Sequence, residues 1–167
     1  MFQPVDLVGA IRPIVIEDGC VVEAFSIEGY RAMQTSNSPT NAVIMQPSTL
    51  CNLDCSYCYL PARRHNLRMM PSVASAVARS VEPWAQGATI DICWHGGEPL
   101  TAGRDHLSLL MDAFDGIRVT HSMQTNASLI DERWIEFLME RCVRVGVSID
   151  GPVDDNDHRI DRAGRPS

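Results

Sequence analysis

The chain lacks long hydrophobic runs and an excess of positive charge. No stretch approaches the roughly 18 apolar residues that a membrane-spanning helix needs, so we expect no membrane segment. Lys and Arg number 14 against 21 Asp and Glu, which gives a net charge of −7. Because nucleic acids and anionic membranes repel an acidic protein, this balance argues against both as general partners.

The first residues of the sequence do not have the pattern of a secretion signal. The first residues, MFQPVDLVGAIRPIVIEDG, show neither a basic start nor a small-residue cleavage site. We therefore expect a cytoplasmic protein. Because that compartment is reducing, we interpret its 6 cysteines as metal ligands or buried thiols rather than as disulfides. A length of 167 residues with 45% hydrophobic content suits one domain with a real core.

What the chain does have is a loop with three cysteines, in the stretch STLCNLDCSYCYLPARR. Cys51, Cys55 and Cys58 are spaced by four and three residues. Two cysteines would suggest a disulfide or redox pair, and a zinc site usually has four ligands, so zinc would need His65 or His95 as well. Ferredoxin-type clusters use four thiolates. An iron–sulfur cubane held by three cysteines leaves one iron open to a substrate or cofactor.

Beyond this loop, the residue pattern predicts strands that alternate with helices. Such alternation is typical of parallel βαβ units. The predicted strands cover residues 42–47, 88–95, 117–126 and 143–152. The predicted helices cover residues 72–85, 106–114 and 131–142, the last with Asp131 as its cap and Trp134, Phe137 and Leu138 on one face.

A small β element is predicted before this pattern. RPIVI and CVVEAFSI are β-rich runs separated by EDG, which favours a hairpin turn. The polar stretch QTSNSPTN then serves as a connector. We therefore divide the chain into a small β lobe with its connector, residues 1–41, and an α/β unit, residues 42–167.

The unusual residue clusters all follow predicted strands. They are the cysteine loop, HGGEP, QTN and SIDGP. In parallel α/β folds the loops at the carboxyl ends of the strands gather on one face, where ligands bind. The sequence therefore predicts one site built from four loops.

These motifs resemble those of the radical S-adenosylmethionine (radical SAM) enzymes. The resemblance rests on C-x3-C-x-aromatic-C, completed by Tyr57, on GGEP after the second strand and on SIDGP at the end of the fourth, and it covers about Ala42 to Ser167. Within that superfamily, MQPSTLCNLDCSYCYLP and GVSIDGP with HRIDRAGR look like SPASM-type peptide maturases, most of all the cyclophane-forming group. Sulfatase-maturating enzymes share much of the pattern.

The resemblance implies a fold, a chemistry and partners. The fold is a partial (β/α) barrel, here with about four strands and the small N-terminal β element. In the family, a [4Fe–4S] cluster binds S-adenosylmethionine at its open iron and cleaves it reductively to a 5′-deoxyadenosyl radical. That radical abstracts hydrogen from a ribosomal precursor peptide, whose side chains are then cross-linked. A reductase, flavodoxin or ferredoxin would be the electron donor.

The same resemblance assigns roles to individual residues. The three cysteines would hold the cluster, and Tyr57 would lie by the adenine. Gly96 and Gly97 would let the backbone approach the cofactor without a Cβ in the way. Glu98, with the glycine carbonyls, would meet the cationic amino group of S-adenosylmethionine.

Three further contacts are implied nearer the end of the chain. Ser148 would contact the ribose or carboxylate of the cofactor, and Arg159 would grip a carboxylate in two places. Asn126 would be a polar contact at the end of the third strand. Structural alternatives stand beside these roles: Ser148 could bond only to backbone, Arg159 could be a solvated charge, and Asp150 could cap a turn.

The family barrel has about six βα units, fewer than the eight of a closed barrel. Since four strands would leave an exposed sheet edge, we expect a marginally stable piece with little turnover: a fragment, a truncated gene product or half of a split enzyme. Two other functions remain open. One is a non-catalytic iron–sulfur or zinc module. The other is a degenerate partner whose β lobe, residues 12–30, adds a strand to a leader peptide.

Overall fold

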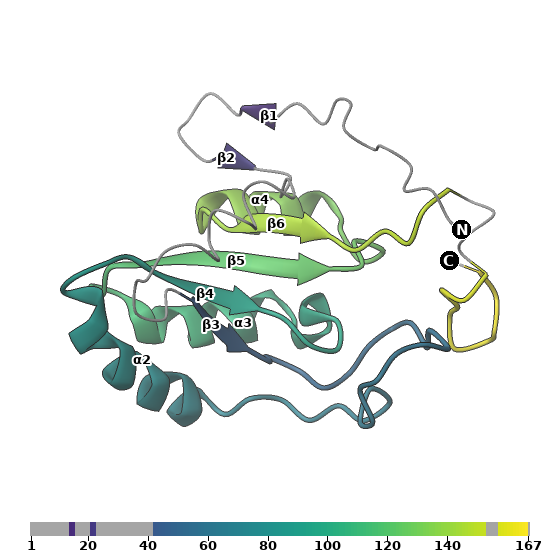
Figure 1. Cartoon of the computed structure of the whole chain (residues 1–167), viewed down its shortest axis with the longest axis horizontal. Coiled ribbons are helices and arrows are strands. Elements are labelled where there is room, and N and C mark those ends of the chain that lie inside the picture. Colours follow the sequence, from purple (N-terminus) through teal and green to yellow (C-terminus); the bar gives the residue numbers. More distant parts are fainter. Residues whose placement is uncertain (1–13, 16–20, 23–41, 153–156, 167) are drawn as a thin grey trace, which may run out of the picture.

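The computed structural model describes residues 14–15, 21–22, 42–152 and 157–166. Its centre is a four-stranded sheet in the order β3-β4-β5-β6, with every neighbouring pair parallel (Figure 1). The strands are β3 (Ala42–Met45), β4 (Ile90–Trp94), β5 (Val119–Thr125) and β6 (Arg144–Val147). The predicted α/β class with parallel strands is confirmed.

Helices connect the strands and cover one face of the sheet (Figure 1). They are α2 (Pro71–Ala85), the short 3₁₀ turns η1 (Pro99–Ala102) and η2 (Asp112–Phe114), α3 (Arg104–Met111) and α4 (Glu132–Glu140). Pro71 suits the first turn of α2, because its missing N–H would have no helical acceptor there. Asp131 caps α4 as predicted: its Oδ1 accepts a hydrogen bond of 2.8 Å from the Trp134 backbone N–H.

The two faces of the sheet carry different side chains, since neighbours along a strand point to opposite sides. Trp94 and Met123 belong to the buried core that also contains the predicted α4 stripe of Trp134, Phe137 and Leu138. The opposite face carries polar groups. There Asp91 of β4 accepts hydrogen bonds of 2.6 Å from Ser122 and 2.7 Å from Arg144, so one carboxylate ties three strands together.

The structure describes only four residues of the predicted N-terminal hairpin. β1 (Ile14–Val15) and β2 (Val21–Val22) pair in antiparallel fashion. Cys20 and most of the predicted lobe lie outside the described residues, so the division at residue 41 stays a prediction. Among the described helices, none is long and apolar enough to cross a membrane.

Several element boundaries differ from the prediction. β6 ends at Val147 rather than at residue 152, and the bend that follows includes Gly151 with a φ of 140°. α3 begins at Arg104, two residues before the predicted start, directly after Gly103 with a φ of 80°. Both glycines adopt backbone angles that disfavour other residues. Gly103 stands directly before α3, whereas Gly151 lies in the bend beyond β6.

Candidate functional site

The loop that carries the three cysteines joins β3 to α2 and folds back on itself. Backbone hydrogen bonds cross it from Thr49 N–H to Leu67 O (3.0 Å) and from Cys51 N–H to Arg63 O (2.8 Å). These bonds fix the first half of the loop against the second, which gives the cysteines a defined backbone without a regular element.

The segment 157–166 packs against this loop (Figure 1). Asp54 N–H donates to Ile160 O (2.8 Å) and Ser56 N–H donates to His158 O (3.0 Å). Arg162 also donates from Nη2 to the carbonyl of Cys51, at 2.6 Å. The cysteine loop is therefore held by a segment about a hundred residues away in the sequence.

The three cysteines are partly buried free thiols. Burial raises the pKa of Cys51, a hydrogen bond from Leu53 opposes the rise, and the nearby Glu98, Cys55 and Cys58 add to it. In the part of the chain that the structure describes, no three or more His, Cys, Asp or Glu side chains are grouped to hold one metal ion.

The glycine pair after β4 packs directly on the cysteine loop. Gly97 has a φ of 61°, and a Cβ there would lie 2.6 Å from the carbonyl oxygen of Leu50 and 2.8 Å from those of Ser48 and Thr49. Glu98 N–H also donates to Leu50 O, at 2.8 Å. A residue with a side chain at position 97 would push these two loops apart, so glycine is required there by space as well as by φ.

Glu98 is almost fully buried, with 1% of its surface exposed. Its Oε1 accepts hydrogen bonds from Leu100 N–H (3.1 Å) and Thr125 Oγ1 (2.6 Å), and its Oε2 accepts one from Asn126 N–H (2.8 Å). The pKa of Glu98 is raised, because the effect of burial exceeds the opposing effects of these bonds and of the charge of Arg159. Because all three partners donate, the geometry suits a carboxylate that ties η1 to the end of β5.

Asn126 links the end of β5 to the cysteine loop. Its Nδ2 donates to Asn52 Oδ1 at 3.0 Å and lies 3.9 Å from Cys51 Sγ. Asn52 in turn donates to Ser128 Oγ at 2.8 Å. The amide of Asn126 therefore lies beside one of the three thiols.

Tyr57 and Arg159 meet at a third side chain, Asp150. The Tyr57 hydroxyl donates to Asp150 Oδ2, and Arg159 Nη1 lies 3.5 Å from the same oxygen. Burial and the bond to Asp150 raise the pKa of Tyr57. Arg159 is only 7% exposed, so the alternative of a solvated charge is wrong.

Ser148 directly follows β6, and both its backbone and its side chain are bonded. Its N–H donates to Thr125 O (2.9 Å), and its hydroxyl oxygen accepts from Gln124 Nε2 (3.1 Å). The QTN cluster includes Gln124, but the residue pattern did not indicate its bond to Ser148, nor the contacts of Asn52 and Arg162, because each depends on which loops meet in space.

The structure thus brings the predicted residues onto neighbouring loops at the carboxyl edge of the sheet. Hydrogen bonds or close packing join the cysteine loop to the turn at Gly97 and Glu98, to Asn126 and to the segment 157–166. The bridge from Tyr57 to Asp150 adds the loop that follows β6. His65 and His95, the candidates for a fourth zinc ligand, belong to no metal-binding group of described residues.

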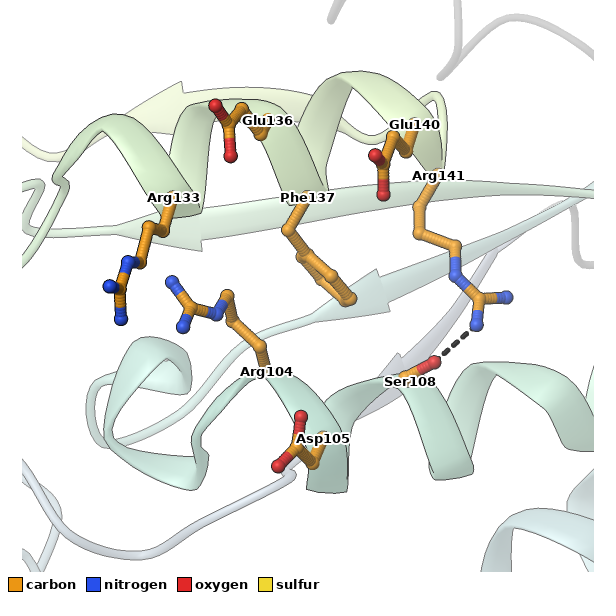
Figure 2. A pocket seen from close by; sticks show the side chains of 8 residues that line it. All are labelled: Arg104, Asp105, Ser108, Arg133, Glu136, Phe137, Glu140 and Arg141. Atoms are coloured by element: carbon orange, nitrogen blue, oxygen red, sulfur yellow. Dashed lines mark hydrogen bonds between the residues drawn. The ribbon is translucent and has the colours of Figure 1, made fainter.

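A separate cavity of about 450 Å³ lies between α3 and α4. Figure 2 shows its polar walls, with Arg141 donating a hydrogen bond to Ser108 and Phe137 between the two helices. Its lining contains Arg104, Asp105, Ser108, Arg133, Glu136, Phe137, Glu140 and Arg141. Its three arginines are balanced by three carboxylates, and it contains none of the predicted site residues.

The chain belongs to the radical SAM superfamily, which matches residues 45–167. This range contains all three cysteines and the four strand-end loops. The superfamily predicted from the motifs is therefore confirmed.

Among curated relatives, an uncharacterized Synechocystis protein is 36% identical over 148 residues, which are 80% of this chain and 36% of that protein. The cysteine-type anaerobic sulfatase-maturating enzyme of Clostridium perfringens is 33% identical over 68% of this chain and 34% of its own. The serine-type enzyme of Klebsiella aerogenes is 32% identical over 74% of this chain and 33% of its own. The chain thus spans about a third of the length of these relatives.

Solved structures show the same fold. Native anSMEcpe with bound AdoMet has a TM-score of 0.65 and 32% identity, over 77% of this chain and 38% of that chain. Streptococcus suis SuiB bound to precursor peptide SuiA has a TM-score of 0.57 at 20% identity, over 75% of this chain and 28% of that chain, and supports the fold alone. The predicted partial-barrel arrangement of four parallel strands is confirmed.

Proposed function

We propose that the chain forms the cofactor-binding part of a radical SAM enzyme that modifies a ribosomal precursor peptide by hydrogen abstraction and cross-linking. The observation that carries this proposal is the packing of the Gly97 turn on the carbonyls that precede Cys51. A metal module would need the cysteines, but it would not need a glycine turn and a buried Glu98 fixed against them.

The residues present fit a [4Fe–4S] cluster. Cys51, Cys55 and Cys58 are free thiols on one backbone-anchored loop, near enough for Cys55 and Cys58 to affect the pKa of Cys51. A cubane attaches each thiolate to a different iron, so the three sulfurs need not converge on one point as they would for a single ion. When bound, the cluster would supply the electron that cleaves S-adenosylmethionine to methionine and a 5′-deoxyadenosyl radical.

The surrounding residues would bind and orient S-adenosylmethionine. Glu98, whose side-chain oxygens accept three hydrogen bonds, would attract the cationic amino group. Tyr57, fixed by Asp150 at its hydroxyl, would present its ring to the adenine. Ser148 would donate to the ribose or carboxylate. Arg159, paired with Asp150 on one side, would use its remaining N–H groups for a carboxylate.

Gly96 and Asn126 complete the proposed cofactor contacts. Gly96 has a φ of 96°, and a Cβ there would lie 3.0 Å from the Gln46 side chain, so this position favours glycine, whose backbone would contact the cofactor. Asn126, beside Cys51 Sγ, would donate a hydrogen bond to a cluster thiolate. The remaining partners, an electron donor such as a flavodoxin or ferredoxin and the precursor peptide, belong to the activity of the whole enzyme.

A second candidate function is sulfatase maturation. It is favoured by identities of 32–33% to anaerobic sulfatase-maturating enzymes, one cysteine-type and one serine-type. Both candidates use the same cofactor site and differ in the peptide. Mass spectrometry distinguishes them: cross-linking removes two hydrogen atoms from a precursor peptide and links two of its residues, whereas the alternative modifies a sulfatase peptide.

Anaerobic reconstitution with iron and sulfide tests the cofactor site. We expect wild-type chain to bind a cluster and, with dithionite and S-adenosylmethionine, to release 5′-deoxyadenosine. Cys58→Ala should lose both properties. Cys142→Ala, which removes an exposed thiol in the turn after α4, should keep both and serves as the control. A colourless, zinc-loaded wild-type protein would contradict the proposal.

A further inference from the structure

Gln124 crosses from β5 to β6 on the polar face of the sheet. It pairs in register with Gly146 of β6, and its Nε2 donates to the hydroxyl oxygen of Ser148, two residues after Gly146, at 3.1 Å. Met123 before it is buried in the core, so the side chain of Gln124 lies on the face away from the helices. The contact is therefore on the polar face, at the edge that carries the proposed cofactor residues.

Gly146 makes this crossing possible. A Cβ at Gly146 would lie 2.3 Å from Gln124 Oε1 and 3.2 Å from its Cδ. The φ of Gly146 is outside the left-handed region, so an alanine would adopt this backbone without strain. The glycine is thus needed for space, and the occupant of that space is the amide of Gln124.

The direction of the hydrogen bond determines what Ser148 can do. A serine hydroxyl has one proton to donate and two lone pairs that accept. Because Gln124 donates, it uses a lone pair and leaves the proton of Ser148 available. The serine is therefore set to donate to a ligand.

We infer that Gln124 is a positioning residue that fixes the Ser148 hydroxyl as a hydrogen-bond donor to an oxygen of S-adenosylmethionine, with Gly146 providing the space. This inference rests on the proposed function. It gives the end of β5 two roles: Gln124 orients Ser148 on one side, while Thr125 and the backbone of Asn126 hold Glu98 on the other.

Binding of S-adenosylmethionine tests the inference without turnover. Equilibrium dialysis of the reconstituted 167-residue chain gives the dissociation constant, and urea unfolding of each variant gives its stability. Gln124→Ala and Gly146→Ala should each weaken binding about three- to tenfold, the effect of one hydrogen bond. Gly87→Ala is the control, because its Cβ would lie 3.9 Å from the nearest atom and meet no clash.

Double variants distinguish an effect of Gln124 on the Ser148 hydroxyl from a general loss of structure. In the Gln124→Ala background, Gly146→Ala should cause no further loss, because the amide that it displaces is gone. In a Ser148→Ala background, Gln124→Ala should also cause no further loss. A further loss of affinity in the Ser148→Ala background would overturn the inference, since Gln124 would then act by another route.

Gln124→Glu tests the direction of the hydrogen bond. A glutamate of the same size accepts the proton of Ser148, so it should weaken binding at least as much as alanine does. Wild-type affinity in Gln124→Glu, or in both single alanine variants, overturns the inference and leaves the proposed function standing. If the wild-type chain binds no S-adenosylmethionine, the proposed function fails, and the inference fails with it.

Discussion

Replacing Gly97 with alanine should separate the cysteine loop from the turn that follows β4. Gly97 has a φ of 61°, where any residue with a Cβ is strained by about 1–2 kcal/mol. Its Cβ would also lie within 2.8 Å of three backbone oxygens, those of Ser48, Thr49 and Leu50. Backbone atoms can yield only if the whole loop moves, which adds an overpacking cost of about 1–3 kcal/mol.

Gly116 offers a matched control for the backbone term. It has a φ of 79° in the turn closed by the bond from Ile117 N–H to Phe114 O, and nothing lies within 4 Å of its Cβ position. Gly116→Ala should therefore cost about 1–2 kcal/mol from backbone strain alone. Gly97→Ala should cost about 2–5 kcal/mol from strain and packing together.

Two measurements compare the variants. Urea unfolding of the metal-free chains gives the free energies, and iron analysis after anaerobic reconstitution gives the cluster content. We expect Gly97→Ala to lose more stability than Gly116→Ala and also to lose iron, because the displaced carbonyls immediately precede Cys51. Equal losses of stability in the two variants, or full iron content in Gly97→Ala, would refute the reasoning.

Three further outcomes are expected. Burial lowers the pKa of His121 from 6.5 to about 4, so the folded state binds fewer protons than the unfolded state between these values. Stability should therefore fall below pH 6.5, by about 2 kcal/mol at pH 5 in urea unfolding, and an identical pH slope in His121→Gln would contradict this cause. Asp131→Ala should lower the free energy of unfolding by about 1 kcal/mol in the same assay, because α4 loses its cap. Asp131→Asn should stay close to wild type, and an unchanged stability of Asp131→Ala would contradict the role of the cap. Glu98→Gln should lower the free energy of unfolding by about 1.5–3 kcal/mol, since the new amide NH₂ would face the Asn126 N–H or another donor. An unchanged unfolding midpoint would show that stability does not need the carboxyl group.

The helices and strands could be predicted from the sequence because each depends mainly on the apolar spacing of neighbouring residues. The apolar spacing of α4 predicts a helix whose Trp134, Phe137 and Leu138 face the core, and all three are buried there. Gly103 illustrates the limit: its φ of 80° stands directly before α3, at a point that the apolar pattern does not mark.

The candidate site was predictable only in part. Cysteine spacing and the GGEP motif indicate chemistry through residue type, so the main loops could be named from sequence. The contacts of Gln124 with Ser148, and of Asp150 with Tyr57 and Arg159, depend on which distant loops meet. A residue pattern does not show burial either: Arg159 lies in a stretch rich in acidic residues and is nevertheless almost inaccessible to water.

The pairing of residues 157–166 with the cysteine loop has a consequence for the order of events during synthesis. Asp54 bonds to Ile160 and Cys51 to Arg162, so the partners of the loop leave the ribosome about a hundred residues after it. Contacts between such distant segments form slowly compared with helices. We therefore expect the iron-binding loop to be made early in translation but to acquire its final shape only after residues 157–166 have been made, so that metal loading follows their synthesis.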